Sequence, residues 1–340
     1  MNNELLNPIL EKCDAAGNLT IFDSFVKAFP KIEKGQRIVC SISGGADSDI
    51  MLDILAQLDT EKKIKYVFFD TGIEYQATKI HLEYLENKYG INIDRMKALK
   101  PVPRGCREYG LPFWSKHASE MIERLQRYNF KWENKPFSEL IKEYPKCRAA
   151  LRWWCNDFPE KTGKDGKIIK SKYNINYIVG LKEYMIAFPP QFKISNKCCK
   201  GAKKDNAKAY LKNNVADLNI IGIRKAEGGI RSAAYKSCFD LAKEAESWDN
   251  YRPIFWYTDK DKAEYEELFG VCHSACYCKY GLKRTGCAGC PFGKDFEKEL
   301  EIIKEYEPKL YIAVNNIFGE SYKYTRRFYE FRAQLKEATQ

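Results

Sequence analysis

The run SGGADS, at residues 43–48, has the composition of a loop that holds phosphate. Gly44 and Gly45 permit backbone conformations that other residues avoid, so several amide groups can converge on one anion. Ser43 and Ser48 add hydroxyl donors, and a helix that begins here would turn its positive end toward the same anion. We therefore predict a phosphate site that includes Asp47. A tight serine-rich turn without a ligand is the alternative.

Cysteines form the second set of residues that could carry out chemistry. Cys198 and Cys199 are adjacent, and Cys287 and Cys290 form a C-x-x-C pair. Together they supply four thiolates from two distant parts of the chain, which is enough for a tetrathiolate metal site. Structural zinc is one possible occupant, and the alternates for its ligands are Cys272, Cys276 and Cys278.

The other cysteines follow no ligand spacing, and we expect most of them to be small core residues. They are Cys13, Cys40, Cys106, Cys147, Cys155 and Cys238. Lysines surround the adjacent pair: Lys193, Lys197, Lys200, Lys203, Lys204, Lys208 and Lys212. A basic environment lowers the pKa of a thiol, so we expect Cys198 and Cys199 to favour the thiolate form.

Polar residues follow two further apolar runs. Asp70 and Thr71 end the run KYVFFDT, with Glu74 close behind, and these three are candidates for contact with a ligand or a metal. Arg224 follows the run LNIIGI, and Arg231 lies seven residues later. Arginine pairs bidentately with oxyanions, so both are candidate anion ligands. A helix-capping turn at Asp70 and an ordinary ion pair at Arg224 are the alternatives.

Buried strands and helices must position these residues. Apolar runs predict strands at Ile38–Ile42, Lys65–Asp70, Ile91–Ala98 and Leu218–Ile223. Apolar spacing predicts a helix capped by Asp47 or Ser48, and others around Thr20–Phe29 (ending at Pro30 and Gly35), at Gln76–Tyr89 and at Asp259–Phe269. Ligands of open α/β sheets lie at the carboxyl ends of the strands, where the candidate residues fall.

We expect three parts along the chain. An N-terminal helical arm covers 1–36, a nucleotide-binding domain covers 37–260, and a cysteine-rich, helical region covers 261–340. A helical insertion at about 100–160 interleaves tryptophans with arginines, a composition that suits an unstacked base as well as an ordinary core.

Composition narrows the class of protein. The chain has 340 residues, 44% of them hydrophobic, and no apolar run near the length of a membrane span, so we expect a cytoplasmic protein without a membrane partner. Its 13 cysteines then indicate metal or sulfur chemistry rather than disulfides. The formal charge of +11 suits phosphate-bearing partners, although a solvated surface would also explain it.

Several motifs together resemble one superfamily. SGGADS resembles the SGGxDS pyrophosphate loop of the adenine-nucleotide PP-loop superfamily, and FFDTGIEYQAT resembles the DTG segment of its phosphoadenylylsulfate (PAPS) reductase branch. The GIR run at Arg224 resembles the region of that branch that meets the substrate's anionic end. Cys198-Cys199 with C-x-x-C at Cys287 resembles the cluster motif of assimilatory adenylylsulfate reductases.

This resemblance implies a Rossmann-like (HUP/PP-loop) α/β fold, a mostly parallel sheet flanked by helices. It also implies an adenine nucleotide with Mg²⁺, and a [4Fe-4S] cluster on the four cysteines. Pyrophosphate would bind Ser43, Gly44, Gly45, Asp47 and Ser48; the nucleoside would lie by Asp70, Thr71 and Glu74; and Arg224 and Arg231 would bind the acceptor or α-phosphate.

Two departures separate the chain from the reductases. No cysteine follows Cys290, whereas the reductases attack sulfur with a C-terminal cysteine, and the loop keeps the Asp47 and Ser48 typical of ATP pyrophosphatases. We therefore expect adenylation of an acceptor by ATP, coupled to sulfur transfer. The alternatives are a sulfonucleotide reductase that uses a thioredoxin-like reductant, and a non-catalytic nucleotide- or nucleic-acid-binding module. A nucleic-acid acceptor and a separate sulfur donor are further expected partners.

Overall fold

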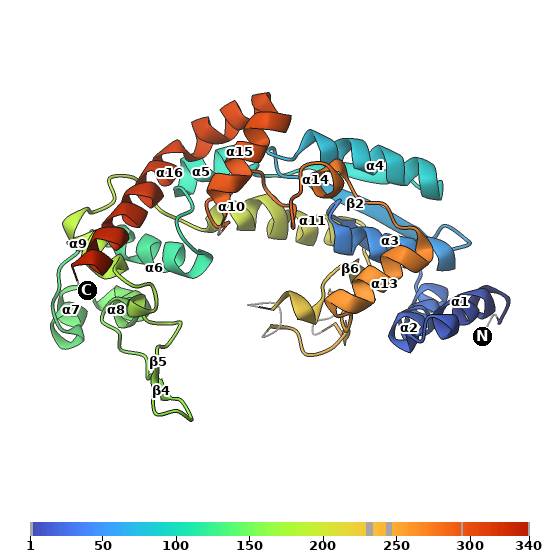
Figure 1. The fold of residues 1–340 in the computed structure, drawn as a ribbon, viewed down its shortest axis with the longest axis horizontal. Helices are drawn as coiled ribbons and strands as arrows, with labels where there is room; N and C mark the ends of the chain where they lie inside the picture. The colour runs from blue at the N-terminus through green and yellow to red at the C-terminus, as the bar shows by residue number, and fades with distance from the viewer. Residues whose placement is uncertain (1–2, 229–233, 243–246, 294, 339–340) are drawn as a thin grey trace. The chain divides into compact units, whose positions relative to one another are not determined.

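The computed structural model describes residues 3–228, 234–242, 247–293 and 295–338. The chain divides into two compact units. The first comprises residues 1–99 and 202–288, and the second comprises residues 100–201 and 289–340. The insertion expected at about 100–160 therefore falls within a longer second unit, which also holds the C-terminal helices (Figure 1).

A mostly parallel sheet forms the centre of the first unit. In the described residues it has six strands in the order β3-β2-β1-β6-β8-β7, and only β7 is antiparallel to its neighbour. The strands are β1 (Ile38–Ile42), β2 (Ile64–Asp70), β3 (Ile93–Lys97), β6 (Leu218–Ile221), β7 (Phe239–Asp240) and β8 (Asp249–Tyr251). This arrangement confirms the predicted Rossmann-like α/β fold.

Alternate residues of β1 and β2 bury opposite faces of the sheet. Ile38, Cys40 and Ile42 pack in the larger core, whereas Val39 and Val67 pack under α11 on the other face. Strands covered on both faces read as nearly continuous apolar runs, and this is the pattern that predicted them.

Helices cover both faces of this sheet (Figure 1). They are α1 (Asn3–Ala15), α2 (Leu19–Lys34), α3 (Ala46–Leu58), α4 (Gln76–Tyr89), α11 (Asp205–Asn213), α13 (Asp259–Phe269) and α14 (Ala275–Cys278), with short turns at Lys200–Lys204 and Lys225–Glu227. The helices predicted at Gln76–Tyr89 and Asp259–Phe269 are confirmed.

Two predicted helix ends differ in detail from the structure. α2 does not stop at Pro30 but runs to Lys34 with the predicted Gly35 at its C-cap, because burial of Phe29 and Ile32 in the core outweighs the one backbone hydrogen bond that proline removes. α3 has Gly45 at its N-cap with no side-chain cap, so Asp47 and Ser48 lie inside its first turn. Their side chains are thereby available for other contacts.

The second unit is largely helical. Its elements are α5 (Val102–Tyr109), α6 (Lys116–Arg127), α7 (Phe137–Glu143), α8 (Arg148–Trp154), α9 (Leu181–Ala187), α10 (Lys197–Cys199), α15 (Phe296–Tyr306) and α16 (Pro308–Glu337), the turns Pro145–Cys147 and Ile175–Tyr177, and a hairpin of β4 (Lys161–Thr162) and β5 (Ile168–Ile169). Trp153 and Trp154 are fully buried in an aromatic core with Phe328 of α16. These tryptophans therefore serve packing rather than base stacking.

Across the described ranges, no helix is both long enough and apolar enough to span a membrane.

Candidate functional site

The loop between β1 and α3 is closed by its own serines. The Ser43 amide donates to Ser48 Oγ at 3.0 Å, and the Gly45 amide donates to Ser43 Oγ at 3.3 Å. The Ser48 amide donates to the Gly45 carbonyl at 2.8 Å. These bonds hold the loop in one conformation at the N-terminus of α3, where helix amides and the helix dipole favour an anion.

Both glycines of the loop are required by their surroundings. Gly44 has φ +65°, and a Cβ there would lie 2.7 Å from Thr78 Cγ2. A Cβ on Gly45 would lie 3.1 Å from the hydroxyls of Tyr277 and Thr285. Larger residues would therefore strain the backbone at Gly44 and displace the neighbouring hydroxyls at Gly45.

Asp47 is held by cations rather than left open. Its Oδ1 lies 3.0 Å from Nε of Arg224 and 3.3 Å from Nζ of Lys262. Arg224 also reaches Asp259, with Nη1 at 2.9 Å from its carboxylate. Burial disfavours the charged guanidinium, but Asp47 and Asp259 outweigh it and raise the pKa of Arg224. The structure thus brings two predicted site residues, Asp47 and Arg224, into direct contact.

The residues after β2 largely bond to one another. The Thr71 hydroxyl donates to Glu74 at 2.5 Å, and the Gly72 amide donates to Asp70 at 2.8 Å. Asp70 also lies 3.6 Å from Lys79. Burial raises the pKa of the Glu74 carboxyl, despite its bonds to Thr71. Asp70 does not cap α4, the helix of the alternative interpretation, because Tyr75 is the N-cap of that helix and no side chain caps it. Of the three residues, Glu74 is the one that lines a cavity.

A cavity of about 830 Å³ opens beside the loop, large enough for a nucleotide. The predicted site residues that line this cavity are Ser43, Gly45, Asp47, Ser48, Glu74 and Arg224. Three lysines that sequence analysis assigned to the cysteine pair, Lys203, Lys204 and Lys208, line it as well. Residues that the sequence analysis missed are Lys262, Tyr277, Lys283, Arg284 and Thr285. The basic run KYGLKRTG before Cys287 is the feature that would have pointed to them.

A charged network anchors α3 just behind the loop. His273 lies between two carboxylates, with Nδ1 at 2.8 Å from Asp49 and Nε2 at 2.8 Å from Glu266. His81 approaches the same oxygen of Asp49 at 3.0 Å. Burial disfavours the charged imidazole of His273, but its bonds to both carboxylates raise its pKa to about 9. Sequence analysis did not predict this network.

The four cysteines of the predicted metal site divide between the units. Cys198, Cys199 and Cys290 belong to the second unit and Cys287 to the first, where its Sγ lies 3.6 Å from Thr71 Oγ1. Within the described part of the chain, no three His, Cys, Asp or Glu side chains are arranged to hold a metal ion. The tetrathiolate site therefore remains a prediction.

Cys106 is buried, as expected of a core residue, but sequence analysis missed its contact with Cys198. A hydrogen bond with its thiol is the largest cause that raises the pKa of Cys198, with burial adding to it. The expected low pKa is therefore wrong for Cys198. α5 approaches so closely that a Cβ on Gly105 would lie 3.1 Å from Cys198 Cα. Gly105, the residue directly before Cys106, was the feature of the sequence that could have indicated the close approach of α5 to Cys198.

The remaining cysteines lie apart from this group. Cys13, Cys40 and Cys147 are buried, as expected of core residues, whereas Cys155 and Cys238 are half-buried. Of the alternates, Cys276 is buried with its Sγ 3.8 Å from Thr78 Oγ1, and Cys272 and Cys278 are exposed. Arg231, the second predicted anion ligand, lies outside the described residues.

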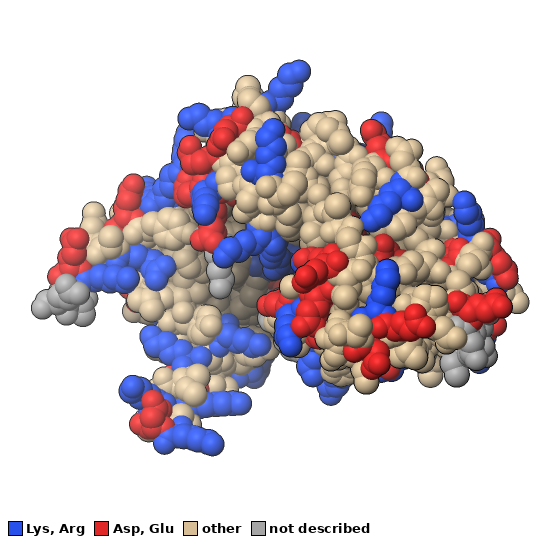
Figure 2. All heavy atoms as spheres, turned by 45° about the vertical axis from the view of Figure 1, so that its right-hand side comes forward, with Lys and Arg blue, Asp and Glu red and all other residues tan. Residues whose placement is uncertain are grey.

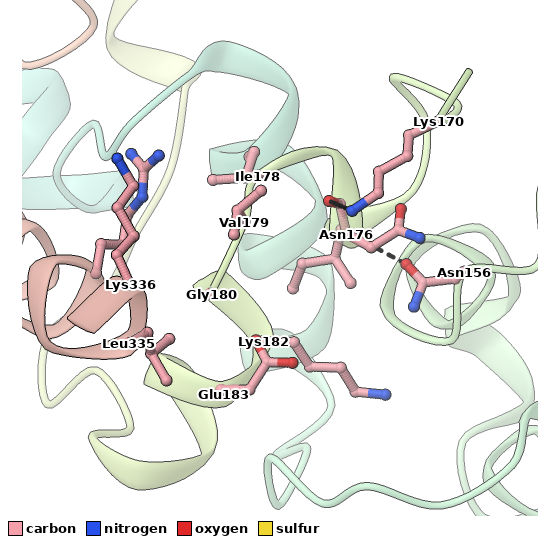
Figure 3. Close-up of a pocket in the computed structure, with 12 residues that line it drawn as sticks. Asn156, Lys170, Asn176, Ile178, Val179, Gly180, Lys182, Glu183, Leu335 and Lys336 are labelled. Carbon is pink, nitrogen blue, oxygen red and sulfur yellow. Dashed lines mark hydrogen bonds between the residues drawn. The ribbon is translucent and has the colours of Figure 1, made fainter. Parts of the chain in front are cut away.

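A separate cavity of about 560 Å³ belongs to the second unit (Figure 3). Ile178, Val179 and Leu335 give it an apolar lining, and Lys170 donates to the Asn176 carbonyl at 3.4 Å at its edge. Sequence analysis assigned no role to these residues.

On the face that Figure 2 displays, groups of acidic and of basic side chains lie among larger areas of uncharged residues. Lysines predominate on the β4–β5 hairpin, which carries Lys161, Lys164, Lys167 and Lys170 around Asp165.

Comparison with known proteins shows that part of the chain is similar to a family domain. Residues 37–151 match the family model of the phosphoadenosine phosphosulfate reductase domain. An uncharacterized protein of Methanocaldococcus jannaschii is 25% identical over 307 residues, which is 87% of this chain and 44% of that protein. The tRNA(Ile)-lysidine synthase of Thermosipho africanus is 25% identical over 145 residues, 42% of this chain and 32% of that protein. The chain thus spans less than half the length of either relative.

Among solved structures, the U34-tRNA thiolase NcsA of Methanococcus maripaludis, determined with its [4Fe-4S] cluster, is similar with a TM-score of 0.36. The sequences are 12% identical, and the match covers 90% of this chain and 78% of that chain.

Proposed function

We propose that the chain binds ATP and transfers its adenylyl group to an oxygen of an acceptor, with release of pyrophosphate, so that sulfur can replace the activated oxygen. One observation carries the proposal. Five of the six residues of the SGGADS loop, all except Gly44, line a nucleotide-sized cavity, and Asp47 of the loop is paired with Arg224. The paired charges keep the Asp47 carboxylate from repelling the leaving pyrophosphate at the N-terminus of α3.

The basic residues around the cavity suit a polyphosphate. Lys203, Lys204 and Lys208 enter from one segment, and Lys283 and Arg284 enter from another. Cations fixed around a developing pyrophosphate stabilise its charge as the α–β bond breaks, and Mg²⁺ bound to ATP would add to this effect. Asp70, Thr71 and Glu74 stay candidates for contact with the nucleoside, Glu74 being the one at the cavity wall.

A [4Fe-4S] cluster is the second part of the proposal, with Cys198, Cys199, Cys287 and Cys290 as ligands and zinc as the alternative occupant. Thiolate sulfur is the donor that such clusters take. Cys198, Cys199 and Cys290 lie in one unit, and the C-x-x-C spacing lets Cys287 and Cys290 reach the same metal group. A bound cluster would supply iron for holding or activating sulfur.

We propose that the acceptor is a nucleic acid, and we favour RNA over DNA. One relative is named for tRNA(Ile), and the lysines of the β4–β5 hairpin provide cations for phosphate contacts. Binding through such contacts weakens steeply with salt, because each one releases counterions. A salt titration of tRNA affinity therefore tests this part separately.

The match of residues 37–151 to the reductase domain supports a second candidate function, that of a sulfonucleotide reductase that forms sulfite. Anaerobically purified protein given ATP, Mg²⁺ and unfractionated RNA should release pyrophosphate, and Gly44→Ala, which would distort the loop, should not. Sulfite from adenylylsulfate and a thioredoxin, without pyrophosphate from ATP, would support the reductase instead. Nucleotide binding with neither product would indicate a non-catalytic binding module.

A further inference from the structure

A tyrosine hydroxyl accepts the hydrogen bond of a backbone amide that a phosphate ligand would use. Ala46 is the first residue of α3, so its amide has no acceptor within the helix. This amide donates to Oη of Tyr277 at 3.1 Å. The acceptor is thus a neutral hydroxyl, at a position where the loop is built to receive an anion.

Tyr277 is held in place from two sides. Its hydroxyl lies 3.1 Å from Oγ1 of Thr285, so one hydroxyl can accept from Ala46 and donate to Thr285. Four residues earlier, His273 is bound to Asp49 of α3 at 2.8 Å. The segment that carries Tyr277 is therefore tied to the same helix whose first amide the tyrosine occupies.

A single amide hydrogen serves one good acceptor at a time. A phosphate oxygen forms a stronger, charge-assisted bond than a hydroxyl does, so exchange is favourable. The exchange still requires the bond between Tyr277 and Ala46 to break, and that requirement lowers the apparent affinity for the anion. The nearby cations Lys262, Lys283 and Arg284 line the same cavity and would attract the anion whether or not the hydroxyl is present.

We propose that the hydroxyl of Tyr277 stands in for a pyrophosphate oxygen at the Ala46 amide, and that pyrophosphate, free or as part of ATP, binds by displacing it. Tyr277 is thereby a positioning residue that sets how tightly the loop holds pyrophosphate. The identity of the anion rests on the proposed function, whereas the competition for the amide rests on the contacts of the Tyr277 hydroxyl with Ala46 and Thr285. A tyrosine that weakens product binding would also promote release of the leaving pyrophosphate.

The test is the dissociation constant of inorganic pyrophosphate, measured by calorimetry on the full chain. Tyr277→Phe keeps the ring and removes the competing oxygen, so we expect pyrophosphate to bind about three- to tenfold more tightly. Thr285→Val removes the partner that holds the hydroxyl and should tighten binding by a smaller factor. Tyr280→Phe is the control, because Tyr280 is not among the described residues that line the cavity, and its affinity should equal that of the unaltered protein.

Tighter binding cannot arise from a folding defect, since damage to the loop would weaken binding. Unchanged or weaker binding in Tyr277→Phe overturns the proposal. Absence of pyrophosphate binding in both proteins would overturn the phosphate site itself, and this inference with it. Tighter binding in Tyr277→Phe without pyrophosphate release from ATP in any protein would support the inference while contradicting the proposed function.

Discussion

Asp47 in the phosphate loop and Arg224 after β6 form an ion pair, with 3.0 Å between Oδ1 and Nε. The two residues are far apart in sequence but face the same cavity. An uncompensated carboxylate at this position would repel an incoming phosphate. The pair therefore explains how an acidic residue can belong to an anion-binding loop: Arg224 and Lys262 neutralise its charge.

Removing Arg224 should expose that negative charge. We expect Arg224→Ala to weaken pyrophosphate binding by at least about tenfold, because a charged hydrogen bond is worth roughly 1.5–3 kcal/mol. Arg224→Lys should recover only part of the affinity, since one ammonium does not reproduce the fork that bonds Asp47 and Asp259 together. Calorimetric titration with pyrophosphate measures both variants, and equal affinity in all three proteins would rule out the role given to Arg224.

The loop glycine Gly44 can be tested against a matched glycine. Gly44→Ala combines a left-handed φ of +65° with a contact of 2.7 Å to Thr78, so it should abolish nucleotide binding and lower stability. Gly281→Ala has a similar φ of +69° but open space around the new methyl group, so it should cost only the backbone strain, roughly 1–2 kcal/mol. Urea unfolding of both variants separates strain from collision. Equal losses would mean that the contact with Thr78 is relieved without cost.

The charged network behind the loop predicts a pH dependence of stability. The pKa of His273 is raised from 6.5 to about 9 by Asp49 and Glu266, against the effect of burial. A raised folded-state pKa gives stability that is complete below pH 6.5 and is lost as pH rises through about 9. Discounted for solvent screening, the contribution is roughly 2 kcal/mol. Lys262 near Glu266 and His81 near Asp49 also face this network and moderate it.

His273→Gln should therefore flatten the decline in unfolding free energy between about pH 6.5 and 9, as measured by urea denaturation. His117→Gln is the control, because burial lowers the pKa of His117 and its contribution has the opposite sign. A decline of the same steepness in His273→Gln would place its origin elsewhere.

Iron content tests the cysteine assignment. After anaerobic reconstitution, we expect about four irons per chain, with loss of iron and of visible absorption in Cys198→Ser and Cys287→Ser. Cys106→Ser should keep its iron but change the spectrum, because outer-shell hydrogen bonds tune a cluster and Cys106 bonds to Cys198. Cys147→Ser, a buried cysteine of the same unit, is the control. Iron lost in Cys106→Ser but kept in Cys287→Ser would make Cys106 the fourth ligand.

Local patterns in the sequence were sufficient for the fold. The apolar runs that became β1 and β2 are buried on both faces, and SGGADS follows β1 directly, so strand, loop and helix could be read from adjacent residues. Gly35 was correctly expected at the end of α2, but the passage of the helix through Pro30 was not, because proline indicates a break and only tertiary packing of Ile32 reveals why the helix continues.

The site was predictable only where its residues adjoin a motif. Asp47 and Arg224 were both expected near the nucleotide, but nothing in the sequence states that they touch. Tyr277 and Cys106 were missed for the same reason: each acts through a contact with a residue far along the chain, Ala46 and Cys198 respectively. Spacing rules describe neighbours in sequence, and such contacts arise only from folding.

The position at which ATP is cleaved tests the central claim most directly. With ATP labelled at the α-phosphate or at the γ-phosphate, Mg²⁺ and unfractionated RNA, the account predicts labelled AMP or adenylylated acceptor from the first substrate and labelled pyrophosphate from the second. Both products should disappear in Gly44→Ala and persist in Gly281→Ala. Formation of ADP and phosphate, or of sulfite from adenylylsulfate with ATP left intact, would contradict it.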